Sequence, residues 1–250
     1  MCLLNAEMLA EVLLFSGHLC YQPKFREASD DPSVPESKKL SDTEVLAQSI
    51  IFLAAGYETS SGTLSLTCYH IATNPDVQDK LQQEIDSVWT EEEQVPTYET
   101  VNELPYLDMV ISETLRLYPP GFMISRGCTK ACAIKDIKIP KDSPILIPVY
   151  SIQRDPAVFP DPEKFDPERF APSAKQSRNP YSFLPFGHGP HSCIGMRFAK
   201  MQIRLVLARM LRKYRLEVAP DTKIPPDVKA KATLGSPEIN LSIVSRPKET

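Results

Sequence analysis

The distribution of proline constrains the fold of this chain more than any other feature. Of the 24 prolines among its 250 residues, 15 lie between Pro96 and Pro190. Because proline removes a backbone N–H donor and clashes with the preceding helical turn, long helices are not compatible with this region. We therefore expect it to consist of turns and extended segments, with one helix after Pro105, and we expect the long helices to lie outside it.

A capping pattern marks the longest expected helix. Ser41 is followed three residues later by Glu44 and then by an apolar run, which is the pattern of a capping box and predicts a helix over residues 42–73. A helix of that length in a globular chain is expected to be a central one. Asn74 and Pro75 predict the N-cap and the first residue of the next helix.

The remaining elements are expected to be shorter. Residues 106–118 and 194–213 predict two further helices. β-branched residues in 132–139 and 144–150 predict a small hairpin between these segments, and the proline-punctuated residues 154–186 predict coil. The expected fold class is therefore mainly α with a small β region.

The N-terminal residues differ from the rest in composition. Residues 1–20 contain the apolar run EVLLFSGHLC, which is too short to span a bilayer and has no basic region before it. Residues 22–40 are polar. We therefore divide the chain into a partial helix with a polar linker over residues 1–40 and a folded portion over residues 41–250, and we expect no signal peptide and no transmembrane segment.

The bulk composition narrows the function classes. A net charge of -4 predicts neither nucleic-acid binding nor strong membrane binding. The six cysteines are irregularly spaced, so a reducing environment is a better expectation than a disulfide framework. Residues 194–215 carry seven basic residues and no acidic one, which predicts a basic helix face.

Cys193 has an unusual local context in FLPFGHGPHSCIGMRFAK, residues 183–200. Gly187 and Gly189 permit unusual backbone angles, a proline stiffens the loop, and a helix is expected to begin at Ile194. The free N–H groups and the positive dipole end of that helix favour a thiolate. We expect a rigid, partly shielded thiolate that can serve as a nucleophile, a redox thiol or a metal ligand.

The residues around this cysteine form the pattern F-G-x-G-x-x-x-C-x-G, with Phe186 and Gly187 at its start. The pattern resembles the haem-thiolate motif of the cytochrome P-450 superfamily. The resemblance implies that Cys193 is the axial ligand of the iron of haem b, since the thiolate donates electron density that favours O–O cleavage. It also implies that Gly187 lets the loop approach the macrocycle and that Phe186 shields the sulfur.

The same resemblance implies two residues at the haem propionates. The family usually has arginine two residues before the cysteine, where this chain has His191. A neutral imidazole donates one hydrogen bond but lacks the fixed charge and the fork of arginine. Arg126, in MISRGCTK, stands where relatives often have a propionate-binding group. We expect both residues to bind the cofactor.

The stretch AAGYETSSG, residues 54–62, places poor helix formers inside the longest expected helix. Taken alone, it can be a kink that packs against a neighbour. It also resembles the family's oxygen-activation motif, which implies that Thr59 hydrogen-bonds dioxygen or an ordered water and that Glu58 belongs to the proton-delivery path. An acid and an alcohol suit a reaction that consumes two protons.

Two further motifs imply a structural cluster. Glu113 and Arg116 in ETLR share a helix face, which by itself indicates only a common surface pair. Followed by LYPP, they resemble the family's E-x-x-R helix, and FDPERF at residues 165–170 resembles the segment that supplies Arg169. The resemblance implies that these three residues form a buried ion cluster behind the haem.

The resemblance extends from about residue 40 to residue 245 and favours the family 3 branch, with thromboxane synthase as a near relative. It implies the C-terminal portion of the P-450 fold and a monooxygenase that acts on an apolar small molecule with electrons from an NADPH-dependent flavoprotein reductase. The reductase is expected to dock on the basic helix after Cys193. The N-terminal half and its anchor to the cytoplasmic side of the endoplasmic reticulum membrane are expected to be absent, so membrane association depends on that missing anchor.

Three alternatives remain at this point. One is an isomerase of a lipid endoperoxide, which needs no NADPH, although Thr59 favours a monooxygenase. Another is a truncated, non-catalytic fragment. The last is a zinc site, although the spacing HGPHSC is not a usual zinc pattern, and its ligands would be Cys128, Cys132, His188, His191 and Cys193.

Overall fold

Helices dominate the computed structural model, which describes residues 39–89, 97–231, 233–235 and 238–247. In chain order the helices are α3 (Asp42–Thr73), α4 (Pro75–Val88), α5 (Tyr98–Asn102), α6 (Pro105–Leu117), α7 (Val149–Ile152), α8 (Pro172–Ser177) and α9 (Met196–Lys213), with 3-10 turns η2 (Pro167–Phe170) and η3 (Pro180–Ser182). The expected fold class is confirmed. The partial helix expected near the N-terminus lies outside the described residues.

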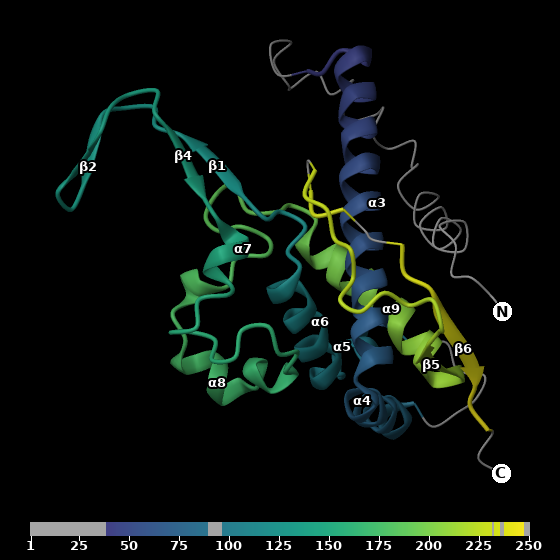
Figure 1. Ribbon diagram of the computed structural model, residues 1–250. Coiled ribbons are helices and arrows are strands. Elements are labelled where there is room, and N and C mark those ends of the chain that lie inside the picture. The colour runs from purple at the N-terminus through teal and green to yellow at the C-terminus, as the bar shows by residue number, and fades with distance from the viewer. Residues whose placement is uncertain (1–38, 90–96, 232, 236–237, 248–250) are drawn as a thin grey trace.

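The strands form three separate two-stranded antiparallel ribbons in the part of the chain that the structure describes. The pairs are β1 (Ile124–Gly127) with β4 (Pro144–Ile147), β2 (Cys132–Ile134) with β3 (Ile137–Ile139), and β5 (Tyr214–Val218) with β6 (Leu241–Ser245). The first two ribbons form an arm that projects from the helices (Figure 1).

The predicted hairpin between residues 132–139 and 144–150 is wrong. Residues 132–139 fold back on themselves as β2 and β3, because Lys135 adopts a positive φ of 52° and permits a tight turn. The β4 segment instead pairs with β1, where Ile124 lies opposite Ile147. Both arrangements use the same β-branched residues, so composition alone did not distinguish them.

The central helix α3 has the predicted bounds, and its capping box is confirmed. The Ser41 hydroxyl accepts the Glu44 N–H at 3.3 Å, and the Glu44 carboxylate accepts the Ser41 N–H at 2.8 Å. Asn74 is the N-cap residue of α4, as predicted, but its side chain makes no capping hydrogen bond to α4 and instead donates to the His70 carbonyl at 2.8 Å, at the end of α3. Pro75 is the first residue of α4, as predicted.

Exposure divides α3 into two halves. The half before Glu58 is exposed and carries large apolar side chains, whereas the half after Ser60 is buried. The exposed apolar residues are Val45, Leu46, Ile50, Ile51, Phe52, Leu53 and Tyr57. The motif at residues 54–62 therefore lies where α3 enters the core.

The hydrophobic core lies between the second half of α3 and helices α4, α6 and α9 (Figure 1). Its fully buried members include Ile71, Leu81, Leu107, Ile111, Ile203 and Leu207. Burial of a side chain of this size contributes about 1.5–3 kcal/mol to the free energy of unfolding. Polar contacts add to it, since the Glu84 carboxylate of α4 accepts the Tyr106 and Leu107 N–H groups at the start of α6 at 2.7 and 3.0 Å.

The segment 154–186 is more ordered than the coil that was predicted. It contains η2, α8 and η3, and a proline stands in the first turn of each: Pro167, Pro172 and Pro180. Proline fits that position because the first N–H groups of a helix have no intrahelical acceptor. The prolines therefore start short helices here.

Candidate functional site

The loop before α9 is closed by its own backbone. The Cys193 N–H donates to the Phe186 carbonyl at 2.8 Å, and the Gly187 N–H donates to the Leu184 carbonyl at 3.0 Å. At the other end, Gly195 is the N-cap residue of α9, and its carbonyl accepts the Ala199 N–H at 2.9 Å. Cys193 is thus held between a tight loop and the start of a helix, which begins two residues later than the sequence predicted.

Two glycines in this loop adopt backbone angles that other residues rarely take, as expected. The φ of Gly187 is 72° and that of Gly189 is 79°. A Cβ atom at Gly187 would lie 3.7 Å from the Ile124 side chain of β1, which is ordinary contact, so the requirement for glycine comes from the backbone angle. The loop therefore needs glycine for its turns.

The Cys193 side chain is exposed, whereas partial shielding was expected from the loop. The Phe186 side chain, expected to cover the sulfur, packs against the hydrophobic core. The next residue, Ile194, is 87 % exposed, and Phe198 in the first turn of α9 is exposed as well. Cys193 is therefore an accessible thiol at an apolar surface.

The structure brings Arg126 and His191 together. Arg126 lies on β1, and its Nη2 donates to the His191 carbonyl at 3.4 Å, while its Nη1 donates to the Ser125 carbonyl at 2.9 Å. The His191 side chain is exposed. The arginine therefore reaches the cysteine loop through the backbone of His191.

This set of groups fits an iron porphyrin. Such a group needs a soft axial donor, an apolar surface for the macrocycle and a cation for its carboxylates. Cys193 offers the thiol, Ile194 and Phe198 offer exposed apolar surface, and Arg126 offers a guanidinium at the same loop. The donor set therefore agrees with the chemistry that the sequence motif predicted.

Glu113, Arg116 and Arg169 lie together, and the side chains of the first two are 0 % exposed. Arg116 Nε and Nη2 donate to the two Glu113 oxygens at 2.7 and 2.8 Å. Arg169 Nε lies 3.5 Å from the same carboxylate, which also accepts the Asp166 N–H at 2.9 Å. Burial raises the pKa of Glu113 against the opposing effect of these partners. The cluster is a buried ionic bracket between α6 and η2.

Gln153 is a fully buried residue that the sequence analysis missed. Its Nε2 donates to the Leu115 and Arg116 carbonyls, each at 3.0 Å, and its Oε1 accepts the Leu184 N–H at 2.8 Å. Its own carbonyl accepts Arg116 Nη1 at 3.0 Å. No local signal marks this glutamine, because its partners lie about thirty to forty residues away in sequence.

The structure places Thr59 and Glu58 at the point where α3 enters the core. The Thr59 hydroxyl donates to the Ala55 carbonyl at 2.7 Å, one turn earlier. The Glu58 carboxylate accepts the Thr233 hydroxyl at 2.8 Å, a contact that the sequence did not indicate. The acid is thus tied to the C-terminal segment and the alcohol to its own helix.

The basic face of α9 is partly neutralised. Asp108 of α6 lies 3.3 Å from Lys200 Nζ and 2.5 Å from Arg204 Nη2. Although burial alone would raise it, these two cations hold the pKa of Asp108 below its usual value. Arg197 and Arg209 on the same helix are exposed. The free positive charge of α9 is therefore smaller than the sequence predicted.

The zinc alternative receives no support from the described residues. No group of three His, Cys, Asp or Glu side chains there is arranged to hold a metal ion. Cys128 and Cys132 lie close together with their Sγ atoms 3.8 Å apart, and the His188 ring packs against Tyr181. The five proposed ligands do not form a single site.

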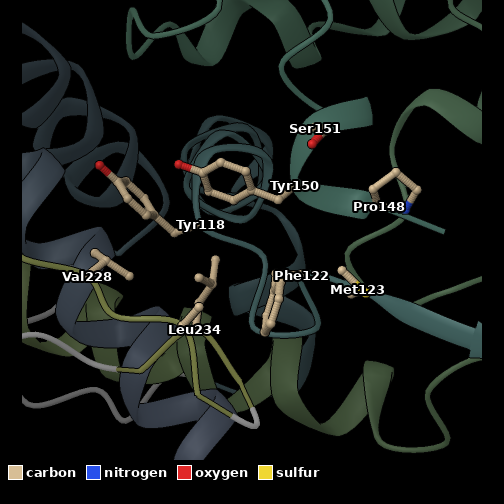
Figure 2. A pocket seen from close by; sticks show the side chains of 9 residues that line it. Tyr118, Phe122, Met123, Pro148, Tyr150, Ser151, Val228 and Leu234 are labelled. Atoms are coloured by element: carbon tan, nitrogen blue, oxygen red, sulfur yellow. The ribbon is translucent and has the colours of Figure 1, made fainter. Parts of the chain in front are cut away.

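An apolar pocket of about 310 Å³ lies beside α7. Figure 2 shows the rings of Tyr118 and Tyr150 on one part of its wall, with Phe122 and Leu234 of the C-terminal segment next to each other on another. Backbone hydrogen bonds fix these segments, since the Leu234 N–H donates to the Pro120 carbonyl at 3.0 Å. The pocket lining is mostly apolar.

Comparison with known proteins agrees with this geometry. The family described as Cytochrome P450 matches residues 22–243. Similar curated proteins include cytochrome P450 3A31 of Mesocricetus auratus, 48 % identical over 220 residues that cover 87 % of this chain and 44 % of the relative. Cytochrome P450 3A41 of Mus musculus is 50 % identical over 188 residues, which are 75 % of this chain and 37 % of the relative.

The match covers only part of each relative. Cytochrome P450 3A12 of Canis lupus familiaris is 45 % identical over 212 residues, which are 85 % of this chain and 42 % of the relative. The chain thus spans less than half the length of the curated relatives that it matches. In the described residues, no helix is long and apolar enough to cross a membrane.

Proposed function

Since this chain belongs to the cytochrome P450 family, in the branch of the 3A relatives, we propose that it functions as a haem-thiolate monooxygenase. In the proposed reaction one atom of O2 enters an apolar small molecule, such as a steroid, a lipid or a xenobiotic. The other oxygen atom leaves as water, and two electrons and two protons are consumed. The observation that carries the proposal is the exposed Cys193 thiol on a backbone-closed loop at the start of α9.

The proposed cofactor is haem b, and the folded portion of the chain, residues 41–250, is proposed to bind it. Cys193 would supply the thiolate ligand of its iron, and Gly187 allows the loop to turn with φ of 72°. Arg126 and His191 bind the propionates, which is supported by the guanidinium that reaches the His191 carbonyl at 3.4 Å. Phe186 packs behind the loop and keeps it against the core. The proposed role of Glu113, Arg116 and Arg169 is structural: they support the loop and take no part in the reaction.

The haem supplies dioxygen activation when bound, with electron density donated by the thiolate. Thr59 and Glu58 are proposed to handle protons at the point where α3 enters the core. The Thr59 Oγ1 can donate or accept a proton once it leaves the Ala55 carbonyl, and the Glu58 carboxylate can exchange one with solvent because it is exposed. The Thr233 hydroxyl orients that carboxylate.

The proposed electron donor is an NADPH-dependent flavoprotein reductase. Exposed Arg197 and Arg209 on α9 favour an acidic partner on the side of Cys193. The apolar pocket beside Phe122 and Leu234 supports an apolar substrate. The proposed location is the cytoplasmic side of the endoplasmic reticulum membrane.

The test is the absorption spectrum of the chain purified with haem, reduced under carbon monoxide. A Soret band red-shifted to the position typical of thiolate-ligated haem is expected for the native chain, and Cys193→Ser should abolish it. Cys132→Ser is the matched control, because Cys132 is also exposed but lies on the arm. No haem uptake by the native chain, or an unshifted band, contradicts the proposal. Product formation that requires NADPH then separates a monooxygenase from an isomerase.

A further inference from the structure

Two cysteines outside the candidate haem site lie in contact. The Sγ atoms of Cys128 and Cys132 are 3.8 Å apart. Cys128 directly follows β1, and Cys132 is the first residue of β2, so both lie on the projecting arm (Figure 1). A disulfide has an S–S distance of about 2.05 Å, so a relative shift of about 1.8 Å would bring the sulfurs to bonding distance. The proposed monooxygenase reaction uses neither thiol.

The two thiols differ in accessibility. Cys128 is only 8 % exposed, and its backbone is fixed from both sides by the Ser143 carbonyl at 3.0 Å and the Asp142 N–H at 2.7 Å. Its Sγ also donates to the Lys130 carbonyl at 3.0 Å. Cys132 is exposed. The Cys132 thiol is therefore accessible to reagents in solution. The Cys128 thiol is buried next to it, on a backbone fixed by hydrogen bonds.

The charge around the pair favours an anionic reagent. Residues 129–142 contain four lysines and two aspartates. Lysine side chains attract carboxylate-bearing molecules. A small anionic disulfide is thus a better match for this arm than a neutral or cationic one.

We propose that Cys128 and Cys132 form a reversible disulfide by exchange with a low-molecular-weight anionic disulfide of the glutathione class. Cys132 is the attacking residue because it is exposed, and Cys128 is the resolving residue because it is buried in contact with it. The sequence showed only irregular cysteine spacing, and the contact arises from the turn between β1 and β2.

The exchange balances in two steps. The Cys132 thiol loses its proton and its sulfur attacks one sulfur of the glutathione disulfide, which releases one glutathione thiolate that takes up the proton. The Cys128 sulfur, after losing its own proton, then attacks the Cys132 sulfur and releases the second glutathione. Two protein thiols are oxidised and one small disulfide is reduced. Its hydrogen bond with Cys128 raises the pKa of Cys132, which lowers the thiolate fraction but makes the thiolate a stronger nucleophile.

The position of the pair links it to the cysteine loop. Cys128 lies two residues after Arg126, whose guanidinium reaches the His191 carbonyl at 3.4 Å. Oxidation would pull the start of β2 toward the end of β1, where the chain passes from the β1–β4 ribbon to the β2–β3 ribbon. A metal is a weaker fit, because no third His, Cys, Asp or Glu ligand joins the pair in the described parts of the chain.

The test is peptide mapping after incubation of the native chain with oxidised glutathione, quenching with iodoacetamide and digestion with trypsin. Cleavage after Arg126, Lys130 and Lys135 places Cys128 in residues 127–130 and Cys132 in residues 131–135. An internal disulfide therefore appears as these two peptides joined and two hydrogen atoms lighter than their sum. The expected result is the joined species, lost on treatment with dithiothreitol and less abundant when the exchange is run in urea.

Two variants separate the roles of the thiols. In Cys128→Ser, the mixed disulfide between Cys132 and glutathione should accumulate because its resolving thiol is gone. In Cys132→Ser, at an exposed position that does not threaten the fold, Cys128 should stay unmodified. Cys193 serves as the exposed cysteine outside the pair in the same digest. Glutathione retained on Cys132 in the native chain, a bond from Cys132 to another cysteine, or an equal yield in urea would each overturn the proposal.

Discussion

Gln153 Oε1 accepts the backbone N–H of Leu184 at 2.8 Å, deep inside the protein. The same side chain donates to the carbonyls of Leu115 and Arg116, which end α6. One amide thus joins the helix that carries the ion cluster to the first residues of the cysteine loop. An amide is suited to this task because it both donates and accepts, which neither a carboxylate nor an ammonium does.

Replacement of this amide by a hydrocarbon should therefore destabilise the fold. Gln153→Leu has a similar volume but leaves the Leu184 N–H and two carbonyls without a side-chain partner. Each unsatisfied buried group costs about 1–3 kcal/mol, so we expect the free energy of unfolding to fall by at least about 2 kcal/mol. The change in the free energy of unfolding is measured by urea unfolding. Gln176→Leu on exposed α8 is the control and should change it by less than about 0.5 kcal/mol; equal effects of the two changes would refute the bridging role.

The ion cluster predicts a large difference between a single and a double substitution. Glu113→Ala leaves Arg116 fully buried without its carboxylate, which should cost about 3–5 kcal/mol of stability. Glu113→Leu combined with Arg116→Met removes both members of the fully buried pair and leaves only Arg169 without its carboxylate, so it should cost less than the sum of the two single changes. Glu168→Ala breaks the exposed pair with Lys80 and should cost less than about 1 kcal/mol. Unfolding curves that show additive losses would contradict a coupled cluster.

The sequence predicts the parts of this structure that depend on local rules. The capping box at Ser41 and Glu44 uses residues three apart, so the start of α3 could be read directly, and the positive φ angles at Gly187 and Gly189 follow from the residue type. The Thr233 contact to Glu58 joins residues 175 apart in sequence and has no local pattern. The fold must exist before such a contact can be seen.

Burial and exposure were the least predictable properties of the site. Arg116 and Glu113 in isolation have the pattern of a surface pair, yet both are fully buried because η2 and Gln153 supply their remaining partners. Cys193 showed the opposite error, since the side chain expected to cover it packs into the core. The residues that bury the ion pair are remote from it in sequence. Phe186, which was expected to cover Cys193, has the core as an alternative packing partner.

His70 predicts a loss of stability in mild acid. Its ring is buried and stacked on Phe165 with 4.2 Å between centroids. Burial, with the nearby charge of Arg116, lowers the pKa of His70 to about 3 in the folded chain, whereas an unfolded histidine titrates near its ordinary value of about 6.5. Between these two pKa values the unfolded chain binds a proton on His70 that the folded chain does not. The full free energy of unfolding is therefore present above a pH of about 6.5, and it falls by about 1.4 kcal/mol for each pH unit of acidification below that.

The matched variant for this effect is His70→Phe, which keeps an aromatic ring against Phe165 and cannot be protonated. Urea unfolding at several pH values should show a steeper decline between about pH 6.5 and pH 4 for the native chain than for the variant. The same slope in both proteins would mean that other groups cause the acid loss.

Thr59→Ala tests the proton-handling role proposed for α3. The change removes a hydroxyl that donates to the Ala55 carbonyl at 2.7 Å, and at this half-buried site it should leave the fold intact. The assay contains the reductase, NADPH and an apolar substrate that the native chain oxidises. A larger share of the NADPH electrons should form hydrogen peroxide in place of product, because proton delivery is no longer ordered. Thr59→Ser keeps the hydroxyl and should retain most of the coupling. A Thr59→Ala chain that converts NADPH to product as efficiently as the native chain would exclude the role.

His191→Arg should slow the loss of haem. Arginine adds a fixed charge and a two-pronged donor where the family usually has one, and a charge-assisted hydrogen bond is worth about 1 kcal/mol more than a neutral one, or roughly a fivefold slower loss. The loss rate is measured by transfer of haem to an excess of a haem-free acceptor globin. His188→Arg places the same charge on the same loop, but at a side chain that packs against Tyr181, and should leave the rate unchanged. An unaltered rate in His191→Arg, or equal slowing by both variants, would show that position 191 does not bind a propionate.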